Sequence, residues 1–193
     1  FELGFPDLFD TSWSMKKTEG AVFWGVKDDE DKVFWEGLRL LQHDGSLVYG
    51  DFSLNLNPSE KEDYLTLTLG MQDIDFRNAT NFVPVHIVGK DLISWLDQSL
   101  ISGLVTEGIF VGYGSIENDA PDNSFTSSIF LKSHQGEVMF SEGWPNLEEL
   151  NANIDIQNSD LLVAAPKVRI KGAQIAHLSA TMFEVEGQDA ESI

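Results

Sequence analysis

DFSLNLNPSEKEDYLTLTLGM, residues 51–71, holds two stretches in which apolar and polar side chains alternate. In the second stretch, every odd position from Leu65 to Met71 is apolar, whereas the even positions carry Tyr, Thr, Thr and Gly. The first stretch alternates in the same way, with Phe and Leu against Ser and Asn. A period of two is typical of a strand with one buried face, and the polar residues between the stretches are typical of a turn. This segment therefore predicts two strands, each with one apolar and one polar face.

Strand patterns cover most of the remaining chain. They are rich in β-branched, aromatic and leucine residues and end at short polar breaks such as DDED and QHDG. Breaks of this length fit antiparallel hairpins, whereas parallel strands need crossovers of about a dozen or more residues. We therefore predict a mainly β fold built as an antiparallel meander. The predicted strands occupy residues 20–27, 32–41, 46–56, 64–71, 102–116, 125–132, 136–140, 147–157, 160–166, 167–172 and 174–187.

One segment has a helical period instead. GKDLISWLDQSL, residues 89–100, has Asp91 near its start and is followed by Ser102 and Gly103. Its apolar positions recur at the spacing of one helix face: Leu92, Ile93, Trp95, Leu96 and Leu100. The segment predicts one amphipathic helix at about residues 90–100, of about three turns.

The domain organisation follows from length and internal similarity. A chain of 193 residues fits one all-β domain, which we place at residues 1–186, with a flexible tail at 187–193. Residues 20–56 loosely resemble residues 136–170, with the predicted helix between them, although common hairpin composition can produce the same likeness. The chain begins with Phe1, and we expect it to be a fragment of a larger protein.

Composition excludes several partners and chemistries. The chain has 32 acidic and 12 basic residues and a net charge of −20, which would repel a nucleic-acid backbone. It has no cysteine, so disulfides, zinc thiolates and thiol nucleophiles are excluded. The sequence contains no stretch of about 18 uninterrupted apolar residues.

Motifs for catalysis or metal binding are missing. The four histidines form no HExxH motif, and no G-x-S-x-G elbow is present. Glu148 and Glu149 are adjacent, so a strand would direct them to opposite faces. The acidic run at residues 28–31 lacks the spacing of a calcium loop and fits a solvated hairpin tip. We therefore predict no enzyme activity, no catalytic residue, no metal site and no cofactor.

The repeated apolar face needs a partner of some kind, because such a surface must meet a second layer or a ligand. Two possibilities follow: a closed β-sandwich, acting as a binding module for carbohydrate or protein, or a curved trough that offers the face to lipid. A hydrolase with two converging carboxylates is a third. If the face is a trough, the alternation predicts these groove-lining, lipid-binding residues, which ordinary core packing would explain equally well: Leu54, Leu56, Leu65, Leu67, Leu69, Ile154 and Ile156.

Two segments resemble the YhdP family of AsmA-like periplasmic lipid-transport proteins of Gram-negative bacteria. They are FVPVHIVGKDLISWLDQSLISGLVTEGIFVGYGSI, residues 82–116, and GEVMFSEGWPNLEELNANIDIQNSDLLVAAPKVRIKGAQIAHLSATM, residues 136–182. The second carries the stronger likeness: an aromatic strand end at Phe140, a turn at Trp144-Pro145 and a corner at Asn158. The sequence GYGSIEND departs from the Gly-Asp ending of the family pattern.

The resemblance implies a curved, open, groove-like sheet and a function. By this likeness, the chain is a segment of a periplasmic protein that is anchored in the inner membrane by a part outside the fragment. Its apolar groove would hold phospholipid acyl chains and carry phospholipid between the inner and outer membranes. The likeness transfers no catalytic residue, since the family pattern consists of strands and turns.

Overall fold

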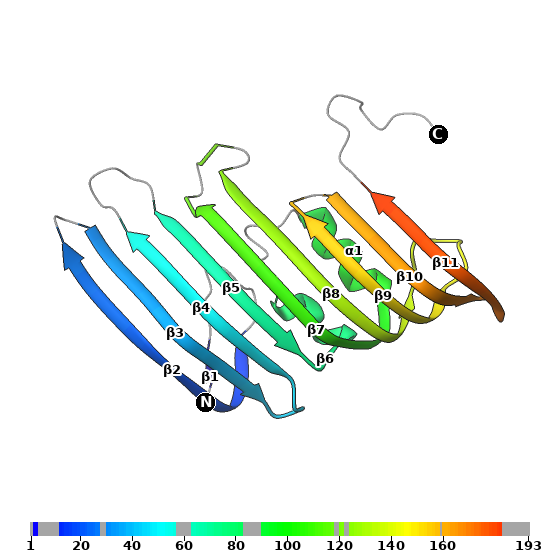
Figure 1. Ribbon diagram of the computed structural model, residues 1–193, viewed down its shortest axis with the longest axis horizontal. Coiled ribbons are helices and arrows are strands. Elements are labelled where there is room, and N and C mark those ends of the chain that lie inside the picture. Colours follow the sequence, from blue (N-terminus) through cyan, green and yellow to red (C-terminus); the bar gives the residue numbers. More distant parts are fainter. Residues whose placement is uncertain are drawn as a thin grey trace.

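The computed structural model describes residues 2–3, 12–27, 30–56, 63–82, 90–117, 120–121, 124–158 and 160–182. The predicted tail at 187–193, the end of the last predicted strand and part of the acidic run at 28–31 lie outside these residues. The described strands form one antiparallel sheet of 11 strands (Figure 1). The predicted mainly β meander is therefore confirmed.

The strands follow the chain order across the sheet, except that the short β6 pairs with β7 beyond the end of β5. The first and last strands lie at opposite ends, so the sheet is open rather than closed on itself (Figure 1). The strands are β1 (Glu2–Leu3), β2 (Trp13–Lys27), β3 (Glu30–Gln42), β4 (Leu47–Leu56), β5 (Tyr64–Gln72), β6 (Ile74–Asp75), β7 (Leu100–Ser115), β8 (Phe125–Val138), β9 (Leu147–Gln157), β10 (Asp160–Ile170) and β11 (Ala173–Met182).

Two helical segments connect β6 to β7. The predicted amphipathic helix is confirmed as α1 (Lys90–Ser99). A 3-10 helix, η1 (Phe76–Phe82), precedes it and was not predicted, because FRNATNF has no repeated apolar spacing. Asp75 caps η1: its carboxylate accepts a hydrogen bond from the Arg77 backbone N–H at 3.0 Å.

The strands are longer than the sequence pattern predicts. Residues 125–132 and 136–140, predicted as separate strands, are joined in β8, which ends at Val138. Likewise, β10 runs through Pro166 instead of ending there. The β9–β10 register shifts between Ala164 and Lys167, and a proline without an N–H is tolerated at such a bulge.

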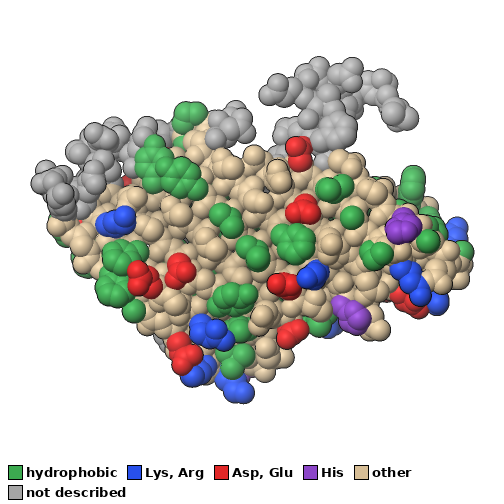
Figure 2. Space-filling model, viewed as in Figure 1, with side chains coloured by type: hydrophobic (Ala, Val, Ile, Leu, Met, Phe, Trp, Pro, Cys, Tyr) green, Lys and Arg blue, Asp and Glu red, His purple; other side chains and the backbone are tan. Residues whose placement is uncertain are grey.

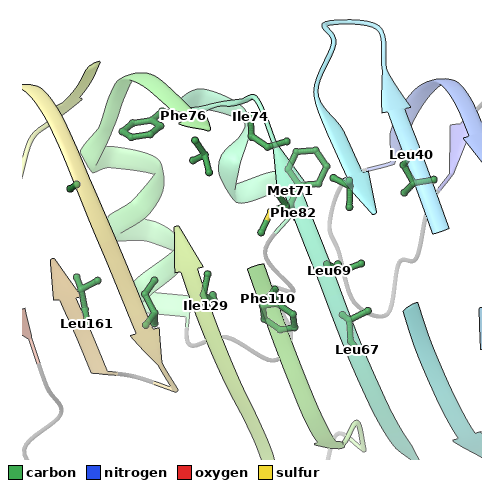
Figure 3. Packing of buried hydrophobic residues seen from close by; sticks show 14 of the residues in the cluster. Leu40, Leu67, Leu69, Met71, Ile74, Phe76, Phe82, Phe110, Ile129 and Leu161 are labelled. Carbon is green, nitrogen blue, oxygen red and sulfur yellow. The ribbon is translucent and has the colours of Figure 1, made fainter. Parts of the chain in front are cut away.

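The core lies between the helices and one face of the sheet (Figure 3). Phe76 and Phe82 of η1 are buried against strand residues such as Phe110. Trp13 at the start of β2 stacks on Phe82 with ring centroids 5.6 Å apart. The Trp13 indole N–H also donates to the Asn81 carbonyl at 3.0 Å. These contacts hold η1 against the sheet.

Candidate lipid-binding face

The seven predicted groove residues lie on one face of the sheet, here called the apolar face. The register shows this directly, because residues paired across antiparallel strands point to the same side. Leu54 pairs with Leu65 across β4 and β5. Leu69 pairs with Phe110 on β7, which pairs with Ile129 on β8, and Ile129 pairs with Ile156 on β9. These side chains therefore share one surface of the sheet, as the alternation in the sequence predicts.

Burial divides the seven residues into two groups. Leu65, Leu67, Leu69 and Ile156 expose only 3 or 4% of their surface and belong to the core. Leu54, Leu56 and Ile154 are half-buried. The chain's own packing thus covers the middle of the apolar face, and only part of the predicted set is accessible to a ligand.

The apolar face continues in an exposed patch on β2. Trp24 pairs with Val33, which pairs with Leu54, so all three share this face. Val22, Trp24 and Val26 expose 60, 72 and 70% of their surface. The sequence analysis missed these residues because Phe23 interrupts the alternation and hides the period of two.

Helix α1 covers the other end of the apolar face without filling the space beneath it. Described residues line two gaps there, of about 40 and 50 Å³. Leu96 and Leu100 line both gaps, together with sheet residues such as Ile156. The side chains that line both gaps are aliphatic or aromatic, apart from the thioether of Met71.

The opposite side, the outer face, is less polar than the sequence predicts. Alternation assigns polar residues to it, yet Ile109, Val111, Tyr113 and Leu162 are exposed there. Figure 2 shows this face, on which hydrophobic side chains lie among acidic and basic ones. The outer face is a mixture, whereas the apolar face forms continuous rows.

Among the residues that the structure describes, no charged side chain is buried in the centre of the apolar face. Among the described residues, the buried polar ones are serines: Ser46, Ser99 and Ser133. Glu149, one of the two adjacent acids considered for catalysis, is exposed and pairs with Arg169 at 2.9 Å. No cluster of three or more potential metal ligands occurs in the described part of the chain.

An exposed ion pair lies beside η1. Arg77 donates to both carboxylate oxygens of Asp75, from Nε at 2.9 Å and from Nη2 at 2.7 Å. The hydrogen bonds from the Arg77 side chain lower the pKa of Asp75 to about 2. This pair stabilises the start of η1 and has no ligand-binding geometry.

Comparison with known proteins identifies the family. The protein family described as YhdP protein matches residues 1–192. The chain belongs to the YhdP family. This confirms the resemblance found in residues 82–116 and 136–182.

A curated relative is the intermembrane phospholipid transporter YhdP of Escherichia coli (strain K12). It is 24% identical over 129 residues, which cover 66% of this chain and 10% of that relative. The match therefore spans about a tenth of the relative's length. No solved structure matched this YhdP-family chain. None of its described helices is long and apolar enough to cross a membrane.

Proposed function

We propose that this chain is one segment of a periplasmic protein, anchored in the inner membrane, whose apolar sheet face carries phospholipid between the inner and outer membranes. The observation that carries the proposal is an apolar face that runs across an open sheet and stays exposed at β2. Family membership and a relative named as a phospholipid transporter support the same function.

The mechanism is shielding of acyl chains from water. Burial of each methylene group stabilises the bound chain by about 0.8 kcal/mol. The accessible parts of the apolar face supply this contact, while the headgroup stays in water. No covalent step is needed, so the segment acts without catalysis.

Individual residues have different parts in this proposal. The half-buried Leu54, Leu56 and Ile154 contact acyl chains, as do the exposed residues of β2. The buried members of the predicted set, such as Leu67, hold the sheet and helices together beneath that surface. The closed sandwich considered from the sequence is not formed, because the described strands make one sheet.

The proposal is tested by mass spectrometry of lipids that co-purify with the chain. We expect phospholipid with the wild-type protein and a clear reduction in Val22→Asp, which places a charge on the exposed apolar face. Val111→Asp is the matched control, since Val111 is also exposed but lies on the outer face. Phospholipid missing from the wild type, or lost equally in both variants, would count against a lipid-carrying face.

A further inference from the structure

The gaps beneath α1 call for an explanation, since protein interiors have few voids larger than a water molecule. The larger gap, about 50 Å³, lies between α1 and the C-terminal strands. Trp95 and Leu96 line its helix side, and Leu161, Val163, Leu178 and Ala180 line its sheet side.

An apolar ligand fits this gap better than water does. A water molecule would need two to four polar partners, and the lining side chains offer aliphatic and aromatic surface. The gap therefore stays dry, and its walls lose the contacts that close packing would supply. A hydrocarbon chain would restore those contacts.

Several described contacts hold the second half of α1. Among the described side chains of α1, Leu96 is the buried apolar one. The Trp95 indole N–H donates to the Phe140 carbonyl at 3.1 Å, and the two rings pack edge to face at 6.1 Å. The Ser99 carbonyl accepts from the Met139 N–H at 2.9 Å, where the helix leads into β7. These contacts hold the end of α1 where it enters β7.

We propose that the cleft between α1 and strands β10 and β11 is a binding site for a phospholipid acyl chain, admitted when α1 tilts away from the sheet. The inference rests on the proposed function and assigns it a specific place. The present gap has the volume of roughly two waters, so the helix must move to admit a chain. Leu178 and Ala180 are half-buried on β11, the last strand of the sheet, and form the entrance.

The test compares two Ala→Leu substitutions. Ala180→Leu fills the cleft, because Ala180 lines it. Ala164→Leu is the control: Ala164 is exposed and points to the outer face, next to the cleft residue Val163 on β10. Each protein is incubated with vesicles of phosphatidylethanolamine containing a trace of a phospholipid with a photoreactive acyl chain. Labelled peptides are then located by mass spectrometry.

We expect the wild type to be labelled on α1 and β11. Ala180→Leu should carry about tenfold less label on these two elements, because its larger side chain overfills a small apolar site. Ala164→Leu should keep the label. Label on α1 and β11 that is unchanged in Ala180→Leu would overturn the cleft. Should Ala180→Leu not fold, Val163→Ile adds one methylene to the same gap and repeats the comparison.

The distribution of label separates this inference from the proposed function. Label on β2 and β4 without label on α1 or β11 would overturn the cleft and leave the lipid-carrying face intact. Label on neither region would contradict both. If Ala180→Leu loses the label on α1 and β11 but keeps the label on β2, the result would support both the cleft and the lipid-carrying face.

Discussion

At the scale of single residues, Leu67 and Val22 carry similar side chains on the same face but have different surroundings. Leu67 exposes 4% of its surface and Val22 exposes 60%. The period of two in the sequence predicts the face to which a side chain points, because it follows from strand geometry. It cannot predict depth of burial, which depends on the segments that fold over that face.

Truncation of these two residues should show the difference. Leu67→Ala should lower the free energy of unfolding by about 2–5 kcal/mol, because it leaves a cavity in the core. Val22→Ala should change it by less than about 0.5 kcal/mol, since the side chain is already in water. Urea denaturation of both variants measures this, and similar losses would show that the face is packed equally throughout.

The Asp75–Arg77 pair predicts a pH-dependent contribution to stability. The pKa of Asp75 is lowered to about 2, so the pair stabilises the fold above the ordinary pKa of about 3.9 and loses its effect as pH falls toward 2. Asp75→Asn keeps a residue type that can cap η1 but removes the charge. The wild type should be more stable at pH 7 by at most about 1 kcal/mol, because the pair is exposed. Urea titrations at pH 7 and pH 2 test this, and a difference that persists at pH 2 would argue against the charge as its cause.

At the scale of elements, the sequence predicts regular segments well and irregular ones poorly. Helix α1 was predicted because apolar residues recur at helical spacing, whereas η1 is too short to show a period. Pro166 was interpreted as a strand end, yet β10 continues past it through a bulge. Local composition indicates a break, and only the pairing with neighbouring strands decides whether the strand stops or bulges.

Glycines in β2 and β4 test the close packing of neighbouring strands. Gly50 has a φ of 153°, and a Cβ there would lie 1.9 Å from the Thr68 carbonyl oxygen of β5. Gly50→Ala should therefore destabilise the protein by more than about 1 kcal/mol. Gly25→Ala is the control, because a Cβ there meets nothing within 4 Å. Thermal denaturation should show a lower melting temperature for the first variant alone, and equal melting temperatures would contradict the β4–β5 geometry.

At the scale of the whole molecule, the alternation predicts the apolar face and the family resemblance implies the open sheet, but neither predicts which part of the face remains accessible. The alternation at residues 51–71 predicts that Leu54 and Leu65 lie on one apolar face, because two alternating strands must turn their apolar sides together. The structure then pairs these two residues across β4 and β5. The cover over Leu65 and the gaps beneath α1 arise from contacts between distant segments, which no local pattern records. The exposed apolar end at β2 became apparent only from the register of four strands.

The central claim is that lipid contacts one face of this sheet, and photo-crosslinking from the hairpin itself tests it most directly. A photoreactive amino acid is placed at Leu54 on the apolar face or at its neighbour Asn55 on the outer face. Both positions are half-buried, so they differ in the face of the sheet to which they point and not in how exposed they are. In cells that make the full-length protein, position 54 should crosslink to phospholipid and position 55 should not. Equal crosslinking at both positions, or at neither, would contradict the account.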